Sequence, residues 1–210
     1  MIDLVNKHRF YFTAYFVFFV ALFIFILNTD ELGATLFFSN HRTEAGDFFF
    51  KWITLLGEIY PFVGLTLYFL IIKKNKFTAQ KMAFSGLFIM VPIFLFKTFF
   101  SFDRPATIIE NMGILPDIHF VTGVEVLRGA TSFPSGHTAS AFVVWTLLAF
   151  EFGNRQLFLQ LLCLTTAILV GVSRVYLIQH FPQDVLFGSS IGMASAWFLD
   201  YVFKRFRETN

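Results

Sequence analysis

Three short clusters in this chain carry side chains that can hold or transfer charge. The first is Lys97, followed after six residues by Arg104-Pro105. Lysine supplies a point charge and arginine a planar fork that suits bidentate contact with phosphate oxygens. Two cations at this spacing predict a place where one oxygen-bearing anion is held.

The second and third clusters add histidines. In Pro134-Ser135-Gly136-His137, a helix starting near Ser135 would point free backbone N–H groups at an anion, Gly136 would allow close approach, and His137 would bring a proton. In Ser173-Arg174-x5-His180-x3-Asp184, the histidine and the carboxylate share one face if the stretch is helical. Asp184 can then bond one ring nitrogen of His180 and leave the other free to attack.

Each cluster taken alone has a simpler explanation. Lys97 can be a lysine snorkelling from a helix end, Pro134-Ser135 an ordinary helix start, and His180 with Asp184 a helix cap with Arg174 as its counter-ion. The case for a site rests on all three clusters reaching the same side of one structure.

The amino-acid composition indicates which class of protein positions these clusters. Apolar residues make up 56% of the 210 positions, charged residues only 14%, and phenylalanine alone supplies 33. A soluble globule has about 25% charged residues, so this chain is no soluble enzyme, disordered tail or nucleic-acid binder. Cys163 is the single cysteine, which excludes an intramolecular disulfide and a cysteine-built zinc site.

The apolar stretches predict an all-α, polytopic membrane protein that forms one domain over residues 1–210. Crossing a bilayer takes about 20 mainly apolar residues. Glu58 is the one charge inside the second stretch, and Pro61 predicts a kink there. Six transmembrane helices are expected, at about 10–29, 52–72, 82–100, 135–150, 156–174 and 184–203.

Basic residues set the orientation. With a cytoplasmic amino terminus, ten of the 16 lysines and arginines fall inside, which favours both termini in the cytoplasm. These ten are Lys7, Arg9, Lys73, Lys74, Lys76, Lys81, Arg155, Lys204, Arg205 and Arg207. The three clusters then all lie at the outer side. Chance placement would have scattered them over both sides of the membrane. Two outer loops remain, at 29–47, where an apolar middle predicts a short interfacial helix, and at 102–134.

The three motifs together resemble the full signature of the type 2 phosphatidic acid phosphatase superfamily, over residues 97–184. The resemblance implies a six-helix bundle and a metal-independent lipid phosphatase without a cofactor, acting through a phosphohistidine. It implies that His180 is the nucleophile, Asp184 its orienting partner and His137 the acid for the leaving oxygen. It also implies a phosphate-binding cradle made of Lys97, Arg104, Ser135, Gly136 and Arg174.

Within that class we expect a lipid phosphate substrate at the outer face of a bacterial plasma membrane. Undecaprenyl diphosphate is favoured, and phosphatidylglycerol phosphate, phosphatidate and lipid A phosphates stay open. A transporter or channel that uses the outer charges as a ligand site is the alternative, because charges within membranes also mark ion pathways. Oligomeric state is not indicated. Glu58 is interpreted as a hydrogen-bonded structural carboxyl, with a place at the edge of the site as the alternative. Solvated charge is expected at His41, Arg42, His119, Glu125 and Arg128, with recognition of the lipid head group as the alternative.

Overall fold

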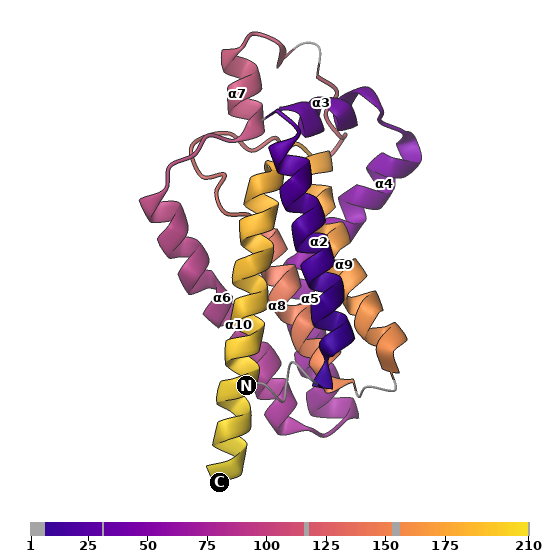
Figure 1. Ribbon diagram of the computed structural model, residues 1–210, viewed down its shortest axis with the longest axis vertical. Helices are drawn as coiled ribbons and strands as arrows, with labels where there is room; N and C mark the ends of the chain where they lie inside the picture. The colour runs from indigo at the N-terminus through magenta and orange to yellow at the C-terminus, as the bar shows by residue number, and fades with distance from the viewer. Residues whose placement is uncertain (1–6, 31, 116–117, 153–155, 210) are drawn as a thin grey trace.

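The computed structural model describes residues 7–30, 32–115, 118–152 and 156–209, and in these ranges it is built of helices (Figure 1). The prediction of an all-α protein is confirmed, and no strand forms in the described ranges. The α-helices are α2 (Arg9–Leu27), α3 (Gly33–Asn40), α4 (Glu44–Ile53), α5 (Ile59–Leu67), α6 (Lys76–Phe99), α7 (Pro105–Asn111), α8 (Gly136–Glu151), α9 (Leu157–Tyr176) and α10 (Pro182–Thr209). A 3₁₀ turn, η1 (Thr54–Gly57), and a π-helical segment, η2 (Tyr68–Ile72), flank α5.

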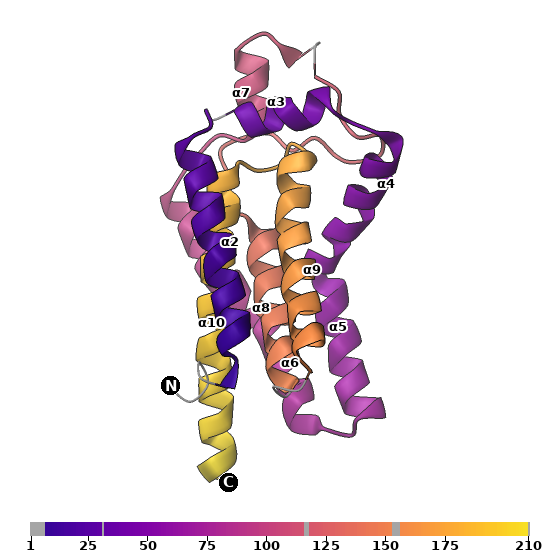
Figure 2. The ribbon, with the colours of Figure 1, turned by 45° about the vertical axis from the view of Figure 1, so that its right-hand side comes forward.

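Helix α8 lies at the centre of the bundle, between α9 and α10 (Figures 1 and 2). Its apolar residues are almost all buried because α6, α9 and α10 surround it. Helix α10 comes so close that a Cβ at Gly188 would lie 2.6 Å from the Ser135 carbonyl oxygen, and one at Gly192 would lie 2.5 Å from the Ala139 carbonyl oxygen. Glycine at these two positions therefore fixes α10 against the start of α8.

Four of the described helices are long and apolar enough to cross a membrane: α2, α6, α9 and α10. A fifth span is available if the bent pair Glu44–Gly57 and Ile59–Ile72 counts as one. Helix α8 has only 16 residues, about 24 Å at roughly 1.5 Å per residue, which is less than the ~30 Å of a hydrocarbon core. The count of six spans thus stays a prediction.

The second predicted span differs from the observed one. Helix starts at Glu44 rather than near residue 52, and the two halves meet at Glu58 with a 59° bend. Pro61 does not kink the helix, because it lies in the first turn of α5, where its missing N–H leaves no intrahelical bond unmade. The break at Glu58 replaces the kink expected at Pro61.

Short helices cover one end of the bundle. Helix α3, in the first outer loop as expected, lies across that end beside α7 of the longer loop, and the start of α2 and the end of α10 lie at the opposite end (Figure 2). The described ends of the chain therefore lie on one side of the molecule. Their cytoplasmic orientation stays a prediction, and Arg155 is outside the described residues.

A buried ion-pair network joins three helices near the end opposite α3. The ammonium group of Lys81 in α6 lies 2.9 Å from Asp200 Oδ1 in α10 and 2.7 Å from Glu151 Oε1 at the end of α8. Asp200 is only 1% exposed and also pairs with Lys204 at 2.6 Å. Because removing one partner of a buried pair leaves an uncompensated charge, the network fastens α6 and α10 to α8.

Candidate active site

The long outer loop brings the first two cations together. Two backbone hydrogen bonds join the ends of this loop: Ser132 N donates to Phe102 O at 3.0 Å, and Arg104 N donates to Gly129 O at 3.0 Å. Lys97, in the last turn of α6, then donates through Nζ to Thr131 O. Arg104 Nη2 donates to the same oxygen at 3.2 Å. The two side chains predicted to share one anion thus share one carbonyl.

His180 and Asp184 form the hydrogen-bonded pair that their spacing predicts. His180 Nδ1 lies 3.3 Å from Asp184 Oδ2, and that oxygen also accepts from Ser132 Oγ at 2.6 Å and from Phe181 N at 3.0 Å. Both side chains are about 3% exposed. Burial lowers the pKa of His180 to about 4, although the hydrogen bond to Asp184 opposes that change. His180 is therefore neutral near pH 7, with Nε2 available for attack.

Arg174 ties this pair to the rest of the site. The backbone N–H of His180 donates to the Arg174 carbonyl at 3.2 Å, so the end of α9 fixes the histidine. The guanidinium is 5% exposed and donates through Nη1 to Thr54 Oγ1 at 2.7 Å, while its Nε is buried without a partner. Arg104, 7% exposed, donates through Nη1 to the Gln179 carbonyl at 2.9 Å, on the other flank of His180. The two guanidinium groups thus flank the nucleophile candidate.

The start of α8 provides the third part of the site. Ser135 is the N-cap, and its side-chain oxygen accepts from the backbone N–H and the hydroxyl of Thr138. Ser135 N donates to the Asp184 carbonyl at 3.1 Å, so the start of α8 is bonded to the start of α10. A Cβ at Gly136 would meet only Ile93 Cγ2, at 3.6 Å, so no protein atom requires glycine there. The open space beside Gly136 favours the interpretation that a ligand approaches its backbone.

All the predicted parts converge on His137. Four residues are close enough for their charges to act on its imidazole: Arg174, His180, Arg104 and Lys97. Side chains that are far apart in the sequence therefore gather around the first turn of α8, and they include three cations and two histidines. Such an arrangement can surround a tetrahedral anion and place a nucleophile and a proton donor against it.

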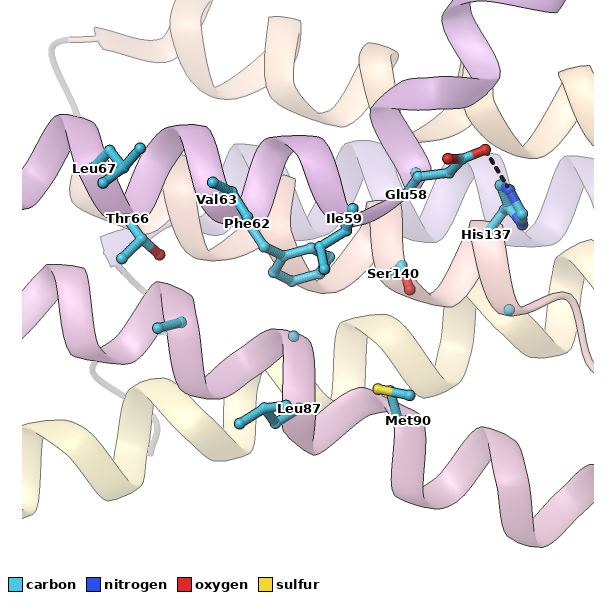
Figure 3. Close-up of a pocket in the computed structure, with 14 residues that line it drawn as sticks. Glu58, Ile59, Phe62, Val63, Thr66, Leu67, Leu87, Met90, His137 and Ser140 are labelled. Carbon is cyan, nitrogen blue, oxygen red and sulfur yellow. Dashed lines mark hydrogen bonds and ion pairs between the residues drawn. The ribbon is translucent and has the colours of Figure 1, made fainter.

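Glu58 also belongs to this group, although the sequence interpretation assigned it a structural role. Its Oε1 lies 3.2 Å from His137 Nε2, and the two side chains are 34% and 32% exposed (Figure 3). A charge in the middle of an apolar stretch was the only signal that could have identified it, and spacing could not show which histidine it meets.

Two cavities meet at the Glu58–His137 pair. An apolar cavity of about 540 Å³ runs from this pair between α5 and α6, past Phe62 and Leu87, to Leu67 (Figure 3). A more polar cavity of about 330 Å³ lies on the other side of the pair, lined by Lys51, Arg174 and Gln179 among others. The site therefore has an apolar and a polar approach.

Most outer-loop charges are engaged elsewhere. Arg42 pairs with Asp47 at 3.1 Å, Arg128 pairs with Glu110 at 2.8 Å, and His41 Nδ1 lies 2.8 Å from the Phe37 carbonyl oxygen. The His119 side chain is exposed. Glu125 lines the polar cavity and accepts from Gln179 through its carbonyl. Of these residues, only Glu125 borders the site.

The acidic, histidine and cysteine side chains of the described residues do not form a metal-binding cluster. Over the described ranges, no group of three or more histidine, cysteine, aspartate or glutamate side chains is arranged to hold an ion. Cys163 is buried in α9. The cationic side chains that the described part of the site does contain are Lys97, Arg104 and Arg174.

Comparison with known proteins places this arrangement in a family. Residues 78–208 match the family model described as the PAP2 superfamily. The chain is 37% identical over 79 residues to a lipid A 1-phosphatase of Porphyromonas gingivalis, and the match covers 36% of this chain and 18% of that protein. It is 38% identical over 93 residues to phosphatidylglycerophosphatase B of Bacillus subtilis, with 40% of this chain and 46% of that protein covered. These matches thus span less than half the length of either relative.

Solved structures agree with the fold. LpxE of Aquifex aeolicus superposes with a TM-score of 0.66 at 28% identity, covering 80% of this chain and 93% of that one. A transmembrane PAP2-type phosphatidylglycerolphosphate phosphatase of Bacillus subtilis superposes with a TM-score of 0.55 at 22% identity, covering 92% and 96%, which supports the fold alone. With a family match over more than half of its length and the motif residues gathered in one site, the chain belongs to the PAP2 superfamily.

Proposed function

We propose that the protein hydrolyses a lipid phosphate through a phosphohistidine at His180. The observation that carries the proposal is the hydrogen-bonded His180–Asp184 pair, flanked by two buried guanidinium groups and facing His137. Neutral His180 attacks phosphorus through Nε2, the cations meet the charge on the phosphoryl oxygens, and His137 protonates the leaving oxygen. Water then attacks the phosphohistidine, and His137 takes up its proton.

The apolar cavity supports a lipid as the leaving group. It begins at His137, the proposed proton donor, and its lining is almost entirely apolar along α5 and α6 (Figure 3). A hydrocarbon chain attached to the leaving oxygen would therefore enter apolar surroundings directly, while the phosphate stays among the cations. Because the tail of a membrane lipid already lies in hydrocarbon, the cavity contributes close packing against its walls and a fixed direction for the tail, rather than removal of methylenes from water.

A bulky residue in this cavity should weaken binding of long lipids only. Ala83 is exposed on the cavity wall, and Ala83→Trp is expected to fill part of the cavity, exclude the tail sterically and raise KM for a long-chain lipid phosphate severalfold. The activity toward p-nitrophenyl phosphate, which has no tail, should change little. Ala21→Trp, at an exposed position of α2, is the matched control. An equal rise in KM for both variants would contradict this use of the cavity.

Inhibitors should show how the site stabilises the negative charge of a bound phosphate. Vanadate can adopt five-coordinate geometry, and we expect it to inhibit competitively because three cations and the backbone N–H groups of α8 surround its position. EDTA is expected to leave phosphate release unchanged, since the proposed mechanism uses protein cations for this purpose. Steady-state phosphate release with each reagent checks both expectations, and loss of activity on chelation that added metal restores would remove the metal-free mechanism.

For the substrate we propose undecaprenyl diphosphate, hydrolysed at the outer face of a bacterial plasma membrane. An outward-facing site suits recycling of a lipid carrier, and the two outer loops carry α3 and α7 above the site. The names of the relatives, a lipid A 1-phosphatase and phosphatidylglycerophosphatase B, supply the competing substrates. Phosphate release should be measured in detergent over undecaprenyl diphosphate, phosphatidylglycerol phosphate, phosphatidate and lipid A phosphates. A higher kcat/KM for any other lipid would overturn the assignment.

The transporter alternative gains no support from the described residues. The charges of the site gather at one end of the bundle, and the buried charges of Lys81 and Asp200 at the other end are closed in ion pairs. A file of polar groups joining the two ends would be expected of an ion pathway. Release of inorganic phosphate that is lost in His180→Ala separates the two functions.

A further inference from the structure

The structure contains a second histidine–carboxylate pair, in addition to His180 and Asp184. Glu58 Oε1 lies 3.2 Å from His137 Nε2, and Glu58 is the only hydrogen-bond partner of that imidazole in the part of the chain that the structure describes. Figure 3 shows the carboxylate reaching from the break before α5 toward the ring at the start of α8. A carboxylate bonded to one ring nitrogen fixes the orientation of the imidazole and the position of its proton.

The break in the second span places this carboxylate. The chain at Glu58 is extended, with φ −98° and ψ −159°, where η1 ends and α5 begins. At the preceding Gly57, an added Cβ would lie 2.6 Å from the His137 carbonyl oxygen, so the chain passes directly against the first turn of α8. Thr54 Oγ1, in η1, accepts a hydrogen bond from Arg174 Nη1. The turn that precedes Glu58 is therefore held against the site at two points, Thr54 and Gly57.

The two pairs engage opposite ring nitrogens. Asp184 bonds Nδ1 of His180, which leaves Nε2 for attack, whereas Glu58 bonds Nε2 of His137, which leaves Nδ1. His137 also stands among Lys97, Arg104 and Arg174, so Glu58 is the carboxylate that the described residues place against a ring surrounded by cations.

We propose that Glu58 is the positioning residue for His137, holding its Nε2–H so that Nδ1 delivers the proton to the leaving oxygen. This inference rests on the proposed function. In the first step the His180 Nε2–phosphorus bond forms, the bond from phosphorus to the lipid oxygen breaks with its electron pair on that oxygen, and the proton on Nδ1 of His137 neutralises it. In the second step water attacks phosphorus, the phosphorus–nitrogen bond breaks, and Nδ1 takes the proton from water. The carboxylate of Glu58 keeps the ring in place through both steps.

Leaving-group dependence tests this role, because proton donation matters for a lipid alkoxide and hardly matters for p-nitrophenolate. Glu58→Gln keeps the size of the side chain and removes its charge. We expect kcat for the lipid phosphate to fall about 10- to 100-fold with KM within twofold, as part of the roughly 10²–10⁴-fold that acid–base catalysis supplies. For p-nitrophenyl phosphate, kcat/KM should change less than threefold, because this ratio reports only the first step, whereas kcat also includes the hydrolysis of the phosphohistidine that both substrates share. Glu110→Gln, which alters an exposed carboxylate paired with Arg128, is the matched control and should match the parent protein.

Two further variants keep the test decisive. Glu58→Asp retains the charge on a shorter arm and should show the same leaving-group pattern with a smaller loss, even if Glu58→Gln folds poorly. The double variant Glu58→Gln/His137→Ala should be no slower than His137→Ala, because the carboxylate acts through that ring. Equal losses of kcat/KM on both substrates, or additive losses in the double variant, would overturn the proposal. If His180→Ala is inactive while Glu58→Gln retains full activity, only the role of Glu58 fails; an active His180→Ala would instead remove the proposed function.

Discussion

Replacing His180 with alanine is expected to lower turnover of a lipid phosphate by about four orders of magnitude or more, because no other described side chain stands in the same place as a nucleophile. The imidazole is buried and bonded to Asp184, with its backbone N–H held by Arg174. Removing it leaves the cations and His137 in place, so substrate should still bind. Phosphate release, together with equilibrium binding of vanadate, checks the two parts of this expectation.

The matched control for that variant is His119→Ala, which removes an exposed imidazole of the outer loop and should behave as the parent protein. Reactions with a radiolabelled lipid phosphate, quenched with alkali and detergent, should show a label on the parent protein that is stable to alkali and lost in acid, as a phosphohistidine is, and none on His180→Ala. Both variants should unfold at the same temperature as the parent. Turnover by folded His180→Ala within tenfold of the parent would contradict covalent catalysis at this residue.

The second large effect is expected for Asp184→Asn, which should reduce kcat about 10²- to 10⁴-fold, as loss of an orienting carboxylate does in other histidine-dependent sites. Asp184 Oδ2 accepts from His180 Nδ1, Ser132 Oγ and Phe181 N, so an amide NH₂ turned toward any of these donors breaks the arrangement. Ser132→Ala is the matched control, because it removes one of three donors and keeps the carboxylate. It should lose less than tenfold in kcat, and a loss as large as that of Asp184→Asn would mean that loop anchoring, rather than orientation of His180, explains the effect.

The pH profile of the parent and of Asp184→Asn refines this prediction. Only neutral His180 can attack, and its pKa is lowered to about 4 by burial. Protonation of His180 therefore removes activity only as the pH falls through about 4, and the fraction of neutral imidazole stays nearly constant from pH 5 to 8. Because the hydrogen bond to Asp184 raises this pKa, its loss moves the pKa further down. The ratio of kcat between parent and Asp184→Asn should thus be flat over pH 5–8.

The site was more predictable from sequence than the path of the chain around it. Local spacing fixes the His180–Asp184 contact, because four positions at a helix start bring the side chains together, and it fixes Ser135 as the cap of α8. The meeting of these motifs with Lys97 and Arg104 followed from placing all three at one side of a membrane. No sequence pattern predicts that Lys97 and Arg104 both donate to the Thr131 carbonyl, because these contacts depend on how the long loop closes.

Glu58 marks the limit of the sequence argument. From hydropathy alone, residues 52–72 are predicted to form one helix, and Pro61 is predicted to kink it. The bend instead follows from tertiary packing at Gly57, where the chain presses against the His137 carbonyl, and a close approach of this kind leaves no periodic trace. The role of a lone carboxylate in an apolar stretch depends on which side chain it meets across the bundle.

The buried contact between Lys81 and Asp200 has a consequence for how the protein is made. Asp200 lies 119 positions after its partner, so α10 is synthesised after both α6 and α8, and a lone charge inside a bilayer costs roughly 2.5–3.5 kcal/mol. The carboxylate of Asp200 can leave water at a lower cost when it docks against the ammonium group of Lys81, which is already present in α6. Insertion of α10 therefore joins an early and a late segment, and the same event brings the Asp184 end of α10 against α8, so the predicted site is complete only after α10 has docked.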